Sequence, residues 1–133
     1  WRACVVGAGR LGTALLGYED FGKRGFDIVA AFDVDPELIG KEVEGIPVLS
    51  IEDLESEIRT RGIELAVLTV PHGPARRIAD RLAEAGVRGI LNFTPTRLRA
   101  RPGVSIRGMD IAVELEGLSY RIVTGGEPGG NGA

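Results

Sequence analysis

The chain has 133 residues and a formal net charge of −3, with 16 Lys and Arg against 19 Asp and Glu. This length suits one domain with a buried core, which aliphatic side chains must build because aromatic residues make up only 5%. An acidic chain with scattered basic residues is a poor candidate for gripping a nucleic-acid backbone by itself. Because Cys4 is the single cysteine, an internal disulfide and a cysteine-based metal cluster are excluded.

The sequence also predicts a cytoplasmic location without membrane contact. A single cysteine, expected to be a buried strand residue, fits a reducing compartment. No apolar run approaches the ~18 residues of a membrane span, and no charged-then-apolar leader opens the chain. Since strand-like sequence follows Trp1 at once, we expect a fragment whose upstream part is missing.

The first third of the chain alternates short apolar runs with segments of helical spacing. Residues 3–6 and 27–32 predict strands because they are short apolar runs. Residues 11–17, between them, carry apolar side chains at helical spacing. Residues 36–39 predict a helical turn, and 47–49 a short strand.

An amphipathic helix is predicted over residues 51–61. Ser50 is its candidate N-cap, with Asp53 in the acidic position of a capping box. Residues 64–70 follow as a continuous apolar run, which is typical of a strand buried on both faces.

The remaining elements continue the alternation. Residues 74–85 predict a helix that Gly86 ends. A strand follows at 87–93, and a shorter strand at 104–106. Residues 110–122 show apolar side chains at helical spacing and predict a final helix.

Apolar strands that alternate with amphipathic helices predict an α/β fold. We expect a Rossmann-type, doubly wound, mainly parallel sheet with flanking helices and a C-terminal helix. The predicted divisions are a Rossmann core at 1–109, a C-terminal helix at 110–123, and a Gly- and Pro-rich tail at 124–133 that we expect to be disordered. Ligands of such sheets bind beyond the strand carboxyl ends, where the strand order reverses.

A G-x-G-x-x-G motif lies between the first predicted strand and the first predicted helix, where a phosphate-binding turn requires it. Its first glycine permits the tight turn, its second lets the backbone approach a pyrophosphate, and its third lets the helix pack closely. Backbone N–H groups and the positive end of the helix dipole would then attract the diphosphate. The alternative is a strand–helix turn with no ligand. The motif consists of Gly7, Ala8, Gly9, Arg10, Leu11 and Gly12.

Asp33 ends the second predicted strand, about 20 residues beyond the glycines, where a carboxylate can accept both ribose hydroxyls. The same charge would repel a 2′-phosphate, so the sequence predicts NAD(H) over NADP(H). Val34, beside it, is assigned to the same site. Asp35 is favoured as an N-cap ahead of Pro36 over a role as a ligand.

Two further strand ends complete the expected cofactor site: Thr69, Val70 and Pro71, and then Asn92 and Phe93. Their polar side chains could face the second ribose or the carboxamide, and their apolar side chains could form a wall against the nicotinamide. Such a wall favours the neutral reduced ring, because an unpaired cation is costly to desolvate. The alternative is ordinary loop punctuation by proline.

The sequence does not predict an enzyme. His72 is the one histidine, and we favour a surface loop residue over a general acid or base because no catalytic partner is apparent. The sequence contains no Ser-His-Asp set, metal-ligand spacing or P-loop. A dehydrogenase would also need substrate-holding residues, which a second domain usually supplies. We therefore assign no catalytic residue and no metal site.

Five stretches together resemble the Rex family of redox-sensing transcriptional repressors: VVGAGRLGTAL, GFDIVAAFDVDP, LAVLTVP, AGVRGILNFTP and DIAVELEGLSY. The resemblance runs from about Cys4 to Ile122, with the motifs in order. It implies a homodimer whose C-terminal helix is swapped between subunits. It also implies repression through operator DNA, bound by an N-terminal winged-helix domain absent from this chain, and release when NADH rises.

The resemblance also implies roles for single residues. The turn at 7–12 is similar to the family's pyrophosphate site, and Asp33 to its adenosine-ribose anchor. Tyr18 and Asp110 are similar to positions that couple cofactor state to the DNA-binding domain. From the residues themselves, Tyr18 could equally be a surface aromatic, and Asp110 the N-cap of the last helix. The residues expected on the swapped helix, which could instead pack within one subunit, are Leu115, Leu118, Tyr120 and Ile122.

The sequence is compatible with three functions. The first is an NADH/NAD⁺-sensing domain of a Rex-type repressor that prefers the reduced cofactor. The second is the nucleotide-binding domain of an NAD-dependent oxidoreductase. The third is a CoA-binding domain like that of succinyl-CoA ligase, since the Rex core resembles that superfamily. Fold analogy cannot separate the three, and the run of matched motifs favours the first.

Overall fold

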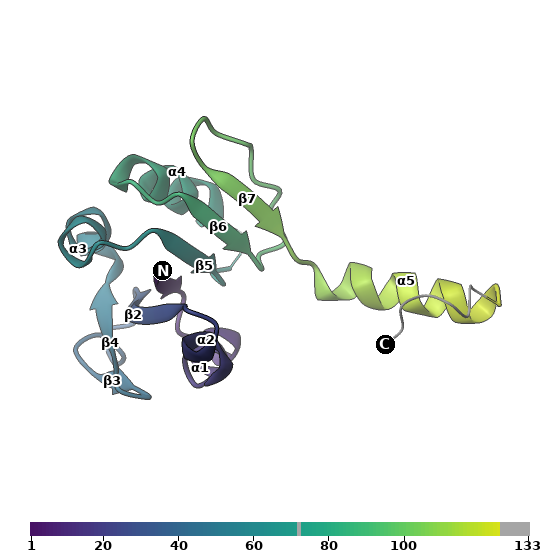
Figure 1. The fold of residues 1–133 in the computed structure, drawn as a ribbon, viewed down its shortest axis with the longest axis horizontal. Helices are drawn as coiled ribbons and strands as arrows, with labels where there is room; N and C mark the ends of the chain where they lie inside the picture. The colour runs from purple at the N-terminus through teal and green to yellow at the C-terminus, as the bar shows by residue number, and fades with distance from the viewer. Residues whose placement is uncertain (72, 126–133) are drawn as a thin grey trace.

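The computed structural model describes residues 1–71 and 73–125 and contains a seven-stranded sheet of order β3-β4-β2-β1-β5-β6-β7 (Figure 1). Every neighbouring pair is parallel except the antiparallel pair of β3 and β4. The predicted Rossmann-type α/β architecture is therefore confirmed. The strands are β1 (Arg2–Val6), β2 (Asp27–Asp33), β3 (Glu42–Val43), β4 (Ile46–Ser50), β5 (Leu65–Leu68), β6 (Gly89–Asn92) and β7 (Ser105–Gly108).

Helices connect the strands on both faces of the sheet. The elements are α1 (Arg10–Leu16), α2 (Asp20–Lys23), the 3₁₀ turn η1 (Ile51–Asp53), α3 (Leu54–Arg61), α4 (Ala75–Ala85) and α5 (Ile111–Val123). Gly62 and Gly86 end α3 and α4 in the left-handed conformation, with φ of 64° and 105°, which glycine adopts without a Cβ penalty.

Alternating side chains of the strands feed two separate cores. In β1, Cys4 and Val6 belong to the larger core, which α3 and α4 cover, whereas Val5 points to the smaller core with Leu16 of α1. In β2, Phe32 and Ala31 divide in the same way. This period of two explains why the central strands read as continuous apolar runs.

The chain turns in opposite directions on the two sides of β1. It runs from β1 outward to β2 and β4, then crosses back to β5, β6 and β7. The strand order therefore reverses between β1 and β5. At such a point the two connecting segments leave the sheet on opposite faces and open a crevice beyond the carboxyl ends.

Several local predictions need correction. The helix expected at 51–61 begins as the 3₁₀ turn η1, and the Ser50 hydroxyl accepts from the Glu52 N–H at 3.2 Å. The capping box with Asp53 is therefore wrong, because the first turn is wound too tightly for the reciprocal contact. The short elements α2 and β3 were not predicted. The turn at 36–39 is confirmed, with the Ile39 N–H donating to the Asp35 carbonyl at 3.1 Å.

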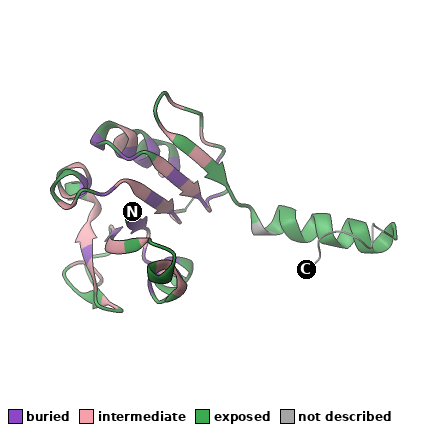
Figure 2. Ribbon diagram, in the orientation of Figure 1, coloured by how far each residue is buried: buried purple, intermediate pink, exposed green. Residues whose placement is uncertain are grey.

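The last helix, α5, extends away from the sheet (Figure 1) and is exposed along its described length (Figure 2). Apolar side chains stand in solvent on it: Leu115 is 60% exposed, Leu118 57% and Tyr120 70%. The alternative that these residues pack within one subunit is therefore wrong for this chain. Among the described residues, no helix is long and apolar enough to cross a bilayer. His72 and the predicted tail from residue 126 lie outside the described residues.

A bidentate ion pair joins α3 to α4. The Arg81 guanidinium donates to Glu55 at 2.6 and 2.7 Å and to the Ile51 carbonyl at 2.8 Å. The hydrogen bond from Arg81 lowers the pKa of Glu55 from its ordinary 4.5 to about 2. The ionised carboxylate thus stabilises the fold above pH 4.5, and this contribution is lost as the pH falls through about 2.

We predict that Glu55→Gln lowers the free energy of unfolding at pH 7 by about 2 kcal/mol, the scale of a charged hydrogen bond. Urea unfolding monitored by circular dichroism between pH 7 and pH 2.5 measures this. The difference between the two proteins should shrink as the pH falls below 4.5, because Glu55 of the unfolded chain then becomes protonated while folded Glu55, with a pKa of about 2, stays largely ionised. Glu84→Gln, on the exposed side of α4, is the matched control. Equal curves for the two variants would contradict the assignment.

Candidate functional site

The glycine turn connects β1 to α1 at the point where the strand order reverses. Gly7 has φ of +102°, a left-handed value that favours glycine, and its N–H donates to the Phe32 carbonyl at 2.8 Å. A Cβ on residue 12 would overlap the Gly7 carbonyl oxygen, whereas a Cβ on Gly9 would meet nothing within 4 Å. The turn and the close helix packing therefore match the roles predicted for the first and third glycines, and the surface at the second is open.

Asp33 lies where the sequence predicts the ribose anchor, and its carboxylate already holds the turn. Oδ2 accepts from the Ala8 N–H at 2.7 Å, and Oδ1 accepts from the N–H groups of Val34 and Asp35 at 2.7 and 2.9 Å. A carboxylate offers about four lone-pair sites, so roughly one remains for a ligand. If Asp33 accepts hydrogen bonds from both ribose hydroxyls, one of its carboxylate lone pairs would have to be shared between a hydroxyl and a backbone N–H.

Asp35 takes the role favoured for it. Its Oδ1 accepts from the Glu37 N–H at 2.9 Å, so its carboxylate caps the turn at 36–39. This accounts for the second acidic residue of the sequence DVD without a ligand.

Thr69 differs from the expectation that it faces a ribose. Its hydroxyl lies 2.7 Å from the Gly7 carbonyl oxygen and 3.1 Å from that of Val6, and it donates to the turn. A hydroxyl has one hydrogen to donate. Thr69 is therefore engaged with the protein's own backbone.

Asn92 also differs, because its side chain is buried. Its Nδ2 donates to the Thr96 carbonyl at 2.8 Å, and its Oδ1 accepts from the N–H and the hydroxyl of Thr94 at 2.9 and 2.7 Å. These bonds use both ends of the amide to fix the loop after β6. Asn92 thus supports Phe93 and Pro95 instead of reaching toward a ligand.

Among the described residues, three hollows lie along this edge of the sheet, and one of them, of about 480 Å³, is lined by Asn92, the loop after it and the start of α5. The other two are lined by most of the remaining predicted site residues. The larger, of about 500 Å³, is lined by Gly7, Gly9, Asp33, Val34, Val70 and Pro71 among others. The smaller, of about 180 Å³, is lined by Leu11, Phe93, Pro95, Met109 and Asp110 with two neighbours. Most of the cofactor-site residues predicted from sequence thus line one of these two hollows, whereas Gly12 lines neither of them. Arg10 lines neither hollow, and Ala8 is buried beneath the turn.

The two residues assigned to coupling lie apart in one chain. Asp110 caps α5, because its Oδ1 accepts from the N–H groups of Ala112 and Val113 at 3.0 and 3.2 Å. The N-cap role that the sequence offered for Asp110 is therefore confirmed. Tyr18 is 53% exposed and packs edge-on against Phe21, with ring centroids 4.8 Å apart. They line different hollows.

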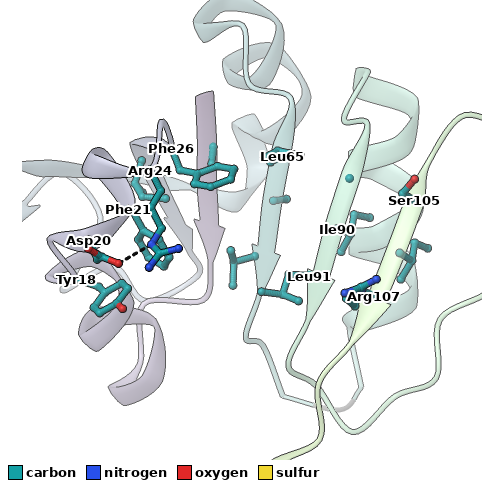
Figure 3. Close-up of a pocket in the computed structure, with 16 residues that line it drawn as sticks. Tyr18, Asp20, Phe21, Arg24, Phe26, Leu65, Ile90, Leu91, Ser105 and Arg107 are labelled. Carbon is teal, nitrogen blue, oxygen red and sulfur yellow. Dashed lines mark hydrogen bonds and ion pairs between the residues drawn. The ribbon is translucent and has the colours of Figure 1, made fainter. Parts of the chain in front are cut away.

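A further hollow was not predicted. It is an apolar groove of about 610 Å³ on the sheet face that α4 does not cover, and we call it the open-face groove (Figure 3). Tyr18, Phe21 and Phe26 form one wall, and Leu65 and Leu91 of β5 and β6 contribute to the floor. The available sequence signal was the lack of any predicted helix between the last two strands, which leaves this face bare.

The described residues offer no metal site and no reactive thiol. No group of three or more His, Cys, Asp or Glu residues among them could hold a metal ion. Burial raises the pKa of the Cys4 thiol to about 12, so Cys4 is a protonated core residue at neutral pH, as predicted.

Comparison with known proteins gives one family match and many repressors. The CoA binding domain family matches residues 1–96. The redox-sensing transcriptional repressor Rex of Rhodopirellula baltica is 48% identical over 122 residues, which cover 92% of this chain and 52% of that protein. Rex of Streptomyces coelicolor is 43% identical over 120 residues, 90% of this chain and 46% of that protein. The chain thus spans about half the length of these curated relatives.

Solved structures agree. RSP, a Rex-family repressor, superposes with a TM-score of 0.87 at 32% identity, covering 93% of this chain and 59% of that one. The same repressor has been crystallised with β-NAD⁺ and operator DNA (TM-score 0.88) and with β-NADH (0.87). UDP-D-quinovosamine 4-dehydrogenase from Vibrio fischeri, at 20% identity and a TM-score of 0.59, shares the fold alone. The chain therefore belongs to the CoA binding domain family and, over nearly its whole length, is similar to the Rex repressors.

Proposed function

We propose that this domain binds NAD(H) at the carboxyl edge of the sheet and acts as the redox-sensing part of a Rex-type repressor. One observation carries the proposal: the glycine turn and the Asp33 carboxylate are joined by a 2.7 Å hydrogen bond at the point where the strand order reverses. The larger hollow would take the adenosine half of the cofactor. The turn would take the diphosphate, through backbone N–H groups and the start of α1.

The smaller hollow would take the nicotinamide. Leu11, Phe93, Pro95 and Met109 give it apolar walls, which favour the neutral reduced ring over the cation. The one carboxylate there, Asp110, already accepts two N–H groups at the start of α5, so its charge is partly compensated by the helix. NADH should therefore bind more tightly than NAD⁺.

Sensing, not turnover, fits the contacts of the described residues. The polar side chains of Thr69, Asn92 and Asp110 are held by backbone groups, so we assign none of them as a catalytic acid or base. A CoA-binding function is the second candidate, because the family match covers residues 1–96. We place the domain in the cytoplasm, where a redox sensor meets the nicotinamide pool.

We further propose a homodimer in which α5 of each subunit lies in the open-face groove of the other. The helix has 13 residues, about 20 Å at 1.5 Å per residue, and its apolar side chains are exposed. Glu114 on α5 and Arg107 at the groove carry opposite charges, whereas Arg24 at the groove already pairs with Asp20 at 2.7 Å. Apart from Asp20, Ser105 and these arginines, the groove lining is apolar, so the two surfaces complement each other. Operator DNA would be contacted only through a winged-helix domain outside this chain.

The cofactor proposal is tested by calorimetric titration of the domain with NADH, NAD⁺, NADPH and CoA in parallel. We predict binding in the order NADH, then NAD⁺, with NADPH weaker than NADH and CoA undetected. Equal affinities for NADH and NAD⁺ would contradict redox sensing and favour the oxidoreductase. Binding of CoA alone would favour the second candidate.

Asp33 should set the discrimination against NADPH. Because the carboxylate repels a 2′-phosphate, we predict that Asp33→Asn narrows the affinity ratio of NADH to NADPH by about tenfold, equivalent to about 1.4 kcal/mol. Asp35→Asn, two residues away, is the matched control and should leave the ratio unchanged. The same narrowing in both variants would mean that general surface charge, and not Asp33, is responsible.

The dimer proposal is tested by sedimentation equilibrium. Leu118→Asp on α5 and Leu91→Asp in the groove should each convert the dimer to a monomer, because each buries an unpaired charge at the interface. Glu116→Gln, elsewhere on α5, should leave the dimer intact. The parent domain is measured over a roughly 100-fold range of protein concentration that ends at about 1 mM, where even a weak dimer forms. A domain that stays monomeric over this whole range would rule out this arrangement.

A further inference from the structure

Thr69 lies at the junction of β5 with the glycine turn. The parallel pairing of β1 with β5 places Leu68 beside Val6, and the Thr69 N–H donates to the Val6 carbonyl at 2.9 Å. The strand pairing therefore fixes the Thr69 backbone one residue beyond the last paired position, directly beside Gly7.

The side chain fills the space that two glycines leave. Its hydroxyl is 2.7 Å from the Gly7 carbonyl oxygen. A Cβ on Gly7 would stand 2.7 Å from the hydroxyl oxygen, and a Cβ on Gly12 would stand 3.2 Å from it. The hydroxyl thus contacts the turn from the side of β5, inside the region that only glycine leaves open.

This contact controls a whole peptide unit. The carbonyl of Gly7 and the N–H of Ala8 belong to one rigid plane and point in opposite directions. Thr69 donates to the carbonyl end at 2.7 Å, and Asp33 accepts from the N–H end at 2.7 Å. The peptide is therefore held from β5 on one side and from β2 on the other.

The next peptide is held as well. The Thr13 hydroxyl of α1 donates to the Ala8 carbonyl at 3.1 Å. At Gly9 the turn opens, since a Cβ there would meet nothing within 4 Å. The backbone is thus fixed up to the residue at which a ligand can approach.

We propose that Thr69 is a positioning residue for the diphosphate site. Its hydroxyl holds the Gly7–Ala8 peptide in the orientation that the diphosphate requires, although it donates to the protein and not to the ligand. This inference rests on the proposed cofactor site and goes beyond it, because it makes dinucleotide affinity depend on a side chain directly after β5. Holding the turn before binding removes an ordering cost from the binding step.

The test compares Thr69→Val, which keeps the shape and removes the hydroxyl, with Thr69→Ser, which keeps the hydroxyl. Calorimetry measures the affinity for ADP-ribose, which carries the diphosphate, and for adenosine, which lacks it. We expect Thr69→Val to bind ADP-ribose about tenfold more weakly, the upper scale of one neutral hydrogen bond. Adenosine affinity should not change, and Thr69→Ser should bind ADP-ribose like the parent protein. Thr60→Val, on exposed α3, is the matched control.

Parent-like ADP-ribose binding by Thr69→Val would overturn the proposal, as would an equal loss for adenosine or no rescue by serine. A ligand-free readout separates this proposal from the cofactor site itself. Hydrogen exchange of the Ala8 amide should accelerate in Thr69→Val and not in Thr69→Ser. Unchanged exchange would overturn the positioning role even if dinucleotides bind. Failure of the parent protein to bind ADP-ribose would instead overturn the cofactor site, and exchange alone would then decide whether Thr69 holds the turn.

Discussion

The close approach of α1 to the end of β1 is the contact on which the site depends. A Cβ on residue 12 would overlap the Gly7 carbonyl oxygen, so the helix can start this close to the strand only because residue 12 has no side chain. With the helix in this place, the turn comes within hydrogen-bonding distance of Asp33 on one side and Thr69 on the other. The three strands that meet at the reversal of strand order are thereby joined through one short piece of backbone.

The same arrangement links the proposed cofactor site to the proposed dimer surface. The smaller hollow is lined by Leu11, in the first turn of α1, and by Met109 and Asp110, which directly precede α5. A nicotinamide in this hollow would contact the residues that set the direction of α5. If α5 lies in the groove of a second subunit, a preference for the reduced ring would bias the relative arrangement of the two subunits. Differential contacts of this kind are what a sensor requires.

The sequence predicts the regular parts of this structure well, for physical reasons. The strand and helix patterns of β1, β2, β5, β6 and α4 follow from side chains buried at periods of two and 3.6. The one-turn helix α2 and the two-residue strand β3 are too short to show a period. The 3₁₀ start at Ser50 depends on hydrogen-bond spacing that the residue types do not reveal.

Within the site, the glycine turn and Asp33 could be predicted because their residue types are dictated by backbone geometry and by charge. The contacts of Thr69 could not, because its partner is a backbone carbonyl 62 residues away, and any residue type offers a carbonyl there. The burial of Asn92 could not be predicted, because a buried amide at a strand end resembles an exposed one in sequence. The open-face groove requires knowing which face each helix covers.

A crystal structure of the domain soaked or grown with NADH tests the central claim most directly. We predict the diphosphate against the backbone of the turn at residues 7–12, the adenosine ribose beside Asp33, and the nicotinamide between Leu11, Phe93 and Met109. NADH in the open-face groove, or a diphosphate that avoids the glycine turn, would contradict it.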